Sequence, residues 1–172
     1  MSDIDNLAVE PIVASELDHL RRCLELAADA VAAGDRPFGS VLADRAGTRL
    51  AEDRNREITT ADPMRHPEIE LARWAGRHLA PAQRAETTMY TSGEHCPMCA
   101  TACALVGLGR IVYISSSAQL TTWLTNWHRA LPPFRAVPID SVAPRIETSG
   151  PIPELVDEIK ALQQRTPWPE AD

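Results

Sequence analysis

The chain has 172 residues, of which 44% are hydrophobic and 24% are charged, a composition that fits one globular domain with its own buried core. The net charge of -7, without any run of basic residues, argues against a protein that holds a nucleic-acid backbone. The sequence opens on acidic residues without the apolar segment of a secretory signal, and no apolar run is long enough to span a membrane. We therefore expect a cytoplasmic protein whose cysteines are reduced.

A long amphipathic helix is predicted after a loosely ordered lead of residues 1–14. Leu, Ala and Val residues recur at helical spacing over 16–33. Ser15 is the expected N-cap, with an acidic residue three positions later in a partial capping box. Gly34 follows the last periodic residue, where helices commonly end on a left-handed glycine.

The rest of the chain alternates strands and helices. Its strand–helix–strand order implies parallel strands that are covered on both faces. The expected strands are 38–44 and 48–54 in a hairpin, 87–92, 110–115 and a short one near 142–148. The expected helices are 67–79, 97–108, 118–130 and 153–165, with a loop at 55–65 and a tail at 166–172. This order predicts a single α/β domain over 1–172, arranged in three layers.

Two short motifs carry the chemistry. Residues 96–99 read Cys-Pro-Met-Cys, a spacing at which two sulfurs can share one metal ion, and His66 begins a His-Pro-Glu motif. One histidine and two cysteines leave one tetrahedral position open, which is the arrangement of a catalytic zinc. Pro67 is favoured at the first position of a helix, so His66 and Glu68 are expected at a helix start. Glu68 is then a carboxylate beside the metal that does not bind it.

Such a site suits hydrolytic attack on an electron-poor ring carbon with loss of an amine. Zinc lowers the pKa of its water to about 7, so hydroxide is available for attack at neutral pH. Glu68 can take the proton and hand it to the leaving amine, first as base and then as acid. The helix starts carry partial positive charge, which favours the thiolate forms of Cys96 and Cys99. A structural zinc site would need a fourth protein ligand, for which Cys103 and His95 are the candidates.

The motif pair resembles the zinc-dependent cytidine and nucleobase deaminase superfamily, whose pattern is His-x-Glu followed by Pro-Cys-x-x-Cys. Residues 37–41 (Pro-Phe-Gly-Ser-Val) look like the Pro-Phe-Gly-Ala-Val strand of guanine deaminases, and 51–62 resembles the segment before the zinc histidine. Residues 90–99 are similar to the family's Tyr-Thr-Ser-x-Glu-Pro-Cys-Pro-Met-Cys. The resemblance covers 15–116 and is closest to guanine deaminases and tRNA adenosine deaminases.

This resemblance implies a three-layer α/β/α fold with a central mixed five-stranded sheet whose last strands are parallel. It implies one Zn²⁺ per chain and a homodimer with the site near the interface. His66, Cys96 and Cys99 would be the zinc ligands, and Glu68 the catalytic proton carrier. Pro67 stands where Ala or Val is usual, which a helix start accommodates.

Substrate contacts are expected from residues around these motifs. In the family the residue matching Asn55 contacts the bound base, although an Asn here also suits a turn. Phe38 is equally a core residue or a pocket wall, and Glu94 either orients the cysteine loop or touches substrate. Ser40 stands where Ala is usual and adds a hydroxyl near the mouth. His95 stands where Pro is usual, and either donates to substrate or faces solvent.

The sequence favours hydrolytic deamination of a small amino-heterocycle, a nucleobase or nucleoside, with guanine as the leading substrate. A tRNA adenosine deaminase has the same core but needs a basic surface for its RNA, which this acidic chain does not suggest. A zinc-stabilised interaction domain without turnover would not need Glu68. Ring specificity is expected from residues after 116, and Trp168 in the tail is a candidate contact to a partner subunit.

Overall fold

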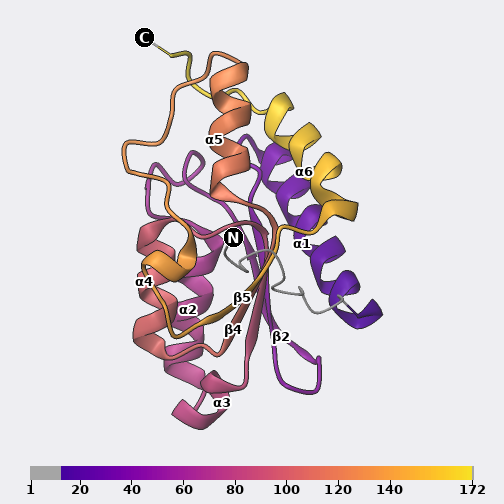
Figure 1. The fold of residues 1–172 in the computed structure, drawn as a ribbon, viewed down its shortest axis with the longest axis vertical. Coiled ribbons are helices and arrows are strands. Elements are labelled where there is room, and N and C mark those ends of the chain that lie inside the picture. Colours follow the sequence, from indigo (N-terminus) through magenta and orange to yellow (C-terminus); the bar gives the residue numbers. More distant parts are fainter. Residues whose placement is uncertain (1–12, 172) are drawn as a thin grey trace, which may run out of the picture.

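A five-stranded sheet lies between two layers of helices in the computed structural model, which describes residues 13–171 (Figure 1). The strands are β1 (Gly39–Ala43), β2 (Arg49–Arg54), β3 (Thr88–Gly93), β4 (Arg110–Ser115) and β5 (Glu147–Ser149). The helices are α1 (Ala14–Ala33), α2 (Pro67–His78), α3 (Pro81–Ala85), α4 (Pro97–Val106), α5 (Ser117–Asn126), the 3-10 turn η1 (Ile139–Ser141) and α6 (Pro153–Arg165). The predicted lead of 1–14 falls almost entirely outside the described residues.

The sheet has the mixed topology that the sequence predicts. Its strand order is β2-β1-β3-β4-β5, with β1 antiparallel to both β2 and β3. A short turn joins β1 to β2, as an antiparallel pair allows. The pairs β3–β4 and β4–β5 are parallel, because α4 and α5 connect the ends of these strands by crossovers. The parallel strands β3 and β4 therefore end at the same edge of the sheet.

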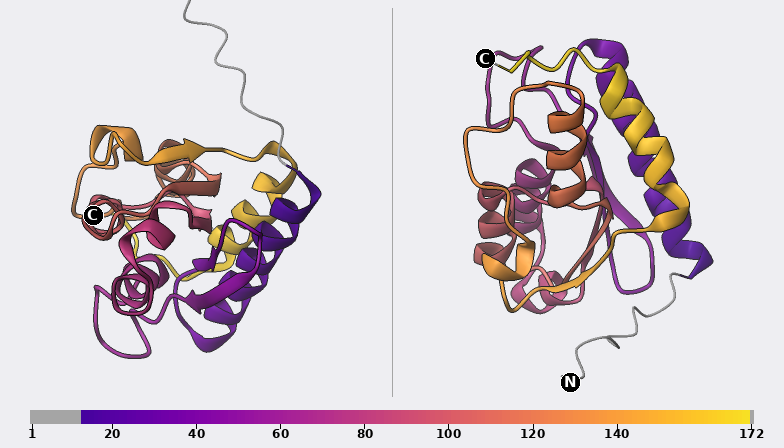
Figure 2. Two further views of the ribbon diagram at one scale, coloured as in Figure 1. Left: turned by 90° about the horizontal axis from the view of Figure 1, so that it is seen from below. Right: turned by 45° about the horizontal axis from the view of Figure 1, so that its top comes forward.

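The helices divide between the two faces of the sheet. Helices α1 and α6 run side by side over one face, whereas α2 and α4 pack together over the other (Figures 1 and 2). Every residue of β1 is buried, since this central strand is covered on both sides. Gly39 allows α1 to approach closely, because a Cβ at this position would lie 2.5 Å from the Cys23 carbonyl oxygen.

The sequence predicted most elements but missed details at their ends. The strand 110–115 and the helix 153–165 are confirmed with the same bounds. The prediction of Ser15 as N-cap is wrong: the helix begins two residues earlier, at Ala14 with Val13 as N-cap, and the Glu16 carboxylate accepts the Val13 N–H at 3.1 Å. Gly34 ends α1 in the left-handed conformation, as predicted.

Helix α3, the length of α5 and the place of β5 depart from the sequence-based expectation. The short helix α3 was not predicted, since its five residues show no apolar period. Helix α5 ends at Asn126 rather than near residue 130, and β5 is only 147–149, so it overlaps the expected strand near 142–148 at its last two residues. In the described part of the chain, no helix is long and apolar enough to cross a membrane.

Candidate active site

The starts of α2 and α4 are built alike and lie next to each other. Each has a metal-ligand type of residue at the N-cap and a proline at the first helical position, His66–Pro67 in α2 and Cys96–Pro97 in α4. Proline suits this position because the N–H that it lacks would have no partner within the helix. Helix α4 begins just beyond the end of β3, so the sheet fixes the position of its first turn. Helix α2 packs against α4, which brings the two helix starts together.

The two helix starts bring three metal-ligand atoms together. The His66 Nδ1 atom lies 3.7 Å from the Cys96 Sγ and 3.6 Å from the Cys99 Sγ. All three ligand atoms lie within 4.8 Å of one another. Among the described residues 13–171 they form the group that could hold a metal ion, and neither His95 nor Cys103 belongs to this group. One imidazole and two thiols are a preferred donor set for zinc, so the cluster fits one Zn²⁺ per chain with three protein ligands.

Protons are unevenly distributed over these three groups. The hydrogen bond from Cys99, reinforced by the His66 ring, lowers the pKa of Cys96 to about 4. The same bond to Cys96, together with burial, holds the pKa of Cys99 well above its usual range. Burial opposes a charge on His66, but bonds to Cys96 and Glu57 outweigh it and raise the pKa of the imidazole to about 10. A metal ion at this place therefore has to displace protons from His66 and Cys99.

Glu68 lies buried beside the cluster and is held from one side. Its Oε1 atom accepts hydrogen bonds from the hydroxyls of Thr91, at 3.1 Å, and Ser40, at 3.3 Å. Its Oε2 atom lies 3.7 Å from the Cys99 Sγ, so this oxygen is the one nearer the metal ligands. Burial raises the pKa of Glu68, which brings a carboxyl group closer to the range useful for proton transfer at neutral pH.

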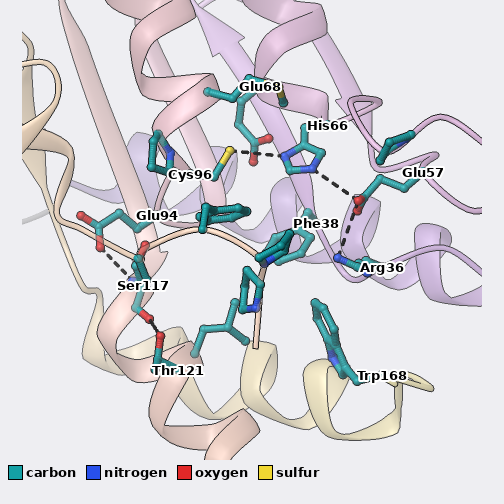
Figure 3. Close-up of a pocket in the computed structure, with 18 residues that line it drawn as sticks. Arg36, Phe38, Glu57, His66, Glu68, Glu94, Cys96, Ser117, Thr121 and Trp168 are labelled. Carbon is teal, nitrogen blue, oxygen red and sulfur yellow. Dashed lines mark hydrogen bonds and ion pairs between the residues drawn. The ribbon is translucent and has the colours of Figure 1, made fainter. Parts of the chain in front are cut away.

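A cavity of about 420 Å³ opens in front of His66, Glu68 and Cys96 (Figure 3). This volume is in the range of small-molecule sites. The remaining lining residues come from the Arg36–Phe38 segment, the loop between β2 and α2, the cysteine loop with the start of α4, α5, the segment 132–136 and the tail: Arg36, Phe38, Glu57, Pro63, Glu94, Pro97, Met98, Ser117, Leu120, Thr121, Pro132, Pro133, Phe134, Ala136 and Trp168. The wall is largely apolar, with a few charged groups placed among aromatic and proline side chains.

Phe38 and Glu94 are the predicted substrate contacts that line the cavity. The Phe38 ring packs against Gly93, where a Cβ would come within 3.0 Å of it. Glu94 uses both carboxylate oxygens to accept backbone N–H groups, from Ser117 at 2.8 Å and from Ile139 at 3.0 Å. It therefore ties the cysteine loop to the start of α5 and to η1, while its side chain still faces the cavity.

The other three predicted contacts, Asn55, Ser40 and His95, are buried and are not among the cavity-lining residues. The Asn55 amide bonds to Glu57 at both ends. Ser40 contacts Glu68 rather than the mouth. The His95 ring lies 3.2 Å from the Met89 sulfur, and burial lowers its pKa to about 3. Their direct contact with substrate stays a prediction.

Among the cavity residues that were not predicted, Arg36 contacts both Glu57 and Trp168 on one side of the opening. The Arg36 guanidinium is 4.6 Å from the centre of the Trp168 ring and forms an ion pair with Glu57 at 3.6 Å. A charged residue just before the Pro-Phe-Gly motif, and a tryptophan in a proline-rich tail, were the available signals for Arg36 and Trp168. Glu57 had none beyond its closeness in sequence to Asn55.

The tail docks on its own chain rather than extending away from it. The Trp168 indole N–H donates to the Gln163 carbonyl at 3.2 Å, and its ring meets Phe38 edge-on with 6.5 Å between centres. The Ala130 N–H donates to the Pro169 carbonyl at 2.8 Å, which anchors the tail beside the end of α5. Trp168 therefore forms part of the cavity of its own chain, and the contact to a partner subunit that the sequence suggests stays a prediction.

Residues 14–115 match the family model for the zinc-binding region of cytidine and deoxycytidylate deaminases. Over 118 residues the chain is 36% identical to the tRNA-specific adenosine deaminase of Haemophilus influenzae, which covers 67% of this chain and 68% of that protein. Over 81 residues it is 40% identical to the guanine deaminase of Bacillus subtilis, which covers 46% of this chain and 51% of that protein.

Solved structures share the fold. The guanine deaminase of Nitrosomonas europaea superposes with a TM-score of 0.67 at 20% identity, covering 90% of this chain and 85% of that one. The guanine deaminase of Bacillus subtilis superposes with a TM-score of 0.55 at 26% identity, covering 74% and 89%. The family match spans both helix starts, and the His/Cys/Cys group lies within the matched residues. The chain therefore belongs to the cytidine and deoxycytidylate deaminase family of zinc-dependent hydrolases.

Proposed function

We propose that this protein removes the amino group of a small heterocycle, a nucleobase or nucleoside with guanine-like rings favoured, and releases ammonia. The observation that carries the proposal is the position of Glu68, which is buried beside three metal-ligand atoms at the inner wall of a cavity of about 420 Å³. Zinc bound by His66, Cys96 and Cys99 supplies the Lewis acid that makes water a nucleophile at neutral pH.

Glu68 has the position of a proton carrier. Ser40 and Thr91 hold its Oε1 atom, which leaves Oε2 on the side of Cys99 to exchange a proton with the reacting groups. In this role Glu68 takes a proton from the attacking water and delivers it to the leaving amine. The apolar side chains of Phe38 and Trp168 flank the opening, where they can orient a flat ring and exclude solvent.

A free small molecule is favoured over a nucleotide within tRNA. The tail residue Trp168 and the segment 132–136 form part of the cavity wall, where they reduce the room for a polynucleotide strand. The net charge of -7 is also unsuited to a phosphate backbone. The match to a tRNA-specific adenosine deaminase extends over 118 residues, against 81 for the match to a guanine deaminase, and supports tRNA adenosine as the second candidate. A zinc-stabilised interaction domain without turnover is disfavoured, because a structural site gains nothing from a buried Glu68.

The proposal includes a homodimer and a cytoplasmic location, as expected from the sequence. Light scattering at working concentration tests the first, with a mass of twice 18.9 kDa as the expected result. A monomeric mass at that concentration would contradict the dimer without affecting the proposed reaction.

Ammonia release tests the proposed reaction. Zinc-loaded protein would be incubated separately with guanine, guanosine, cytosine, adenine, amino-triazines and amino-pterins, and with a tRNA containing adenosine at the wobble position. We expect ammonia from at least one free ring compound and none from the tRNA. Turnover of tRNA alone would favour the second candidate. No release from any of these compounds by protein with bound zinc would exclude the proposed reaction.

A further inference from the structure

The two nitrogens of the His66 ring face different partners. Nδ1 points toward the sulfurs of Cys96 and Cys99, whereas Nε2 lies 3.5 Å from the Glu57 Oε1 atom. Figure 3 shows the resulting line of contacts from Cys96 through His66 to Glu57 and Arg36. A carboxylate therefore stands behind the ring, on the side opposite the metal ligands.

The Glu57 carboxylate is itself fixed. Asn55 donates from Nδ2 to Oε2 at 2.7 Å, and its Oδ1 accepts the Glu57 backbone N–H at 3.0 Å. Arg36 pairs with Oε1 at 3.6 Å. The Glu57 side chain is only 10% exposed, so it has little freedom to move away from His66. Both oxygens thus have assigned partners, one shared between His66 and Arg36 and the other bound to Asn55.

Asp35 fixes the backbone that follows Glu57. This buried carboxylate accepts the N–H groups of Ile58 and Thr59, both at 2.9 Å, and pairs with Arg54 at 3.0 Å. The loop between β2 and α2 is thereby attached to the end of α1. Although Glu57 lies in an irregular loop, its side chain can therefore be held at a defined place against His66.

We propose that Glu57 is a positioning residue for the metal site: it accepts the His66 Nε2–H and so fixes the ring with Nδ1 toward the metal. A carboxylate behind a metal-bound histidine selects the tautomer, fixes the ring and makes the ligand nitrogen more basic. Asn55 acts through Glu57 in this arrangement, because both ends of its amide are already bonded to that residue.

The test is a metal-affinity measurement on full-length protein. Zinc-free wild type and Glu57→Gln would compete for Zn²⁺ with a chromogenic chelator at pH 7.5. Glu57 presents a different oxygen to each partner, Oε1 to His66 and Oε2 to Asn55, and glutamine replaces one of these two oxygens by an NH2 group that cannot accept a hydrogen bond. We expect zinc affinity to fall by about 10- to 100-fold, the usual effect of losing such a partner. The matched control is Glu70→Gln in α2, the helix that begins after His66; its carboxylate pairs with Arg65 and Arg73, and the zinc affinity of this variant should equal that of wild type.

A second measurement needs no variant. In zinc-loaded wild type, nitrogen NMR should show His66 protonated at Nε2 and slow to exchange this proton with solvent. A rapidly exchanging Nε2–H, or a ring protonated at Nδ1, would overturn the inference even if Glu57→Gln failed to fold. Wild-type zinc affinity retained by a folded Glu57→Gln variant would overturn it as well.

This inference rests on the zinc site of the proposed function, and the two can fail separately. Wild type that takes up no zinc would overturn both. Wild type that binds zinc and releases ammonia, beside a Glu57→Gln variant of equal zinc affinity, would overturn only the role of Glu57.

Discussion

The two sides of the cavity are built in different ways. The metal wall, meaning His66, Glu68, Cys96 and Cys99, stands on the starts of α2 and α4, which a shared sheet and a helix–helix contact hold in place. The outer wall, meaning the segment 132–136 and Trp168, belongs to no regular helix or strand. Regular elements hold reacting groups accurately, whereas irregular segments are free to vary in shape. The chemistry should therefore depend on the metal wall, and the choice of ring on the outer wall.

The largest expected effect comes from removing a metal ligand. Cys99→Ala deletes one of three donor atoms, so the purified variant should lose its zinc and its ammonia release should fall to background for every substrate. Metal content by mass spectrometry and ammonia release are measured on the same sample. The control is Cys23→Ala, which removes a buried thiol far along α1 and should retain one zinc per chain. If Cys99→Ala retained one zinc per chain and released ammonia, the assignment of Cys99 as a metal ligand would be wrong, and the chemistry would not depend on the metal wall as described.

A large effect on stability is expected at Asp35, which ties the loop carrying Glu57 to α1. Burial opposes its charge, but hydrogen bonds from Thr59, Arg54 and Ile58 prevail and lower the pKa of Asp35. Asp35→Ala leaves these donors without a partner and should lower the free energy of unfolding by about 3 kcal/mol at pH 7. Urea unfolding gives this difference directly, with Asp29→Ala on the exposed side of α1 as control.

The effect of Asp35 on stability should depend on pH in one direction. Because its pKa is lower in the folded protein than in the unfolded chain, its ionisation stabilises the fold above about pH 4. That contribution is lost as the pH falls through the folded-state pKa. Unfolding at pH 7 and pH 3 should therefore give a smaller difference between wild type and Asp35→Ala at the lower pH. A difference that grows on acidification would contradict this assignment.

The smallest effect is expected on the outer wall. Trp168→Ala removes an aromatic side chain that contacts Arg36 and Phe38 but none of the metal ligands. Loss of ring contact weakens substrate binding by about 1–1.5 kcal/mol, so KM should rise about tenfold while kcat changes little. Steady-state kinetics on the best substrate of the panel measure both constants. The control is Glu170→Gln, which changes an exposed residue of the same tail. A fall in kcat with unchanged KM for Trp168→Ala would mean that Trp168 acts in the chemical step rather than in substrate binding.

The metal wall could be predicted from the sequence because its signals are local. The proline after each N-cap indicates which residue begins the helix. The spacing of the two cysteines and the His-x-Glu motif indicate which side chains can bind the metal and which one can carry the proton. The parallel pairing of β3 with β4 followed from the order of elements, since a crossover helix makes neighbouring strands parallel. The complete mixed five-stranded sheet was implied by the resemblance to the deaminases. Each of these predictions depends on residues that lie close together in the sequence, where spacing and residue type indicate the local structure.

The outer wall and the partners of buried groups could not be predicted, because they depend on contacts between distant segments. Trp168 reaches Arg36 only because the tail returns past the end of α5. Ser40 meets Glu68 because β1 lies next to β3 in a register that pairs Ser40 with Thr91. Glu57 stands behind His66 because Asp35 fixes its loop. None of these relationships has a period or a motif in the sequence.

The central claim, that Glu68 carries the proton in a zinc-dependent deamination, is tested most directly by Glu68→Gln. Zinc content and turnover would be measured together on the best substrate of the panel. We predict one zinc per chain, as in wild type, with kcat reduced by about 10²- to 10⁴-fold, the usual contribution of a general acid–base group. Undiminished turnover in the zinc-loaded variant would contradict the account.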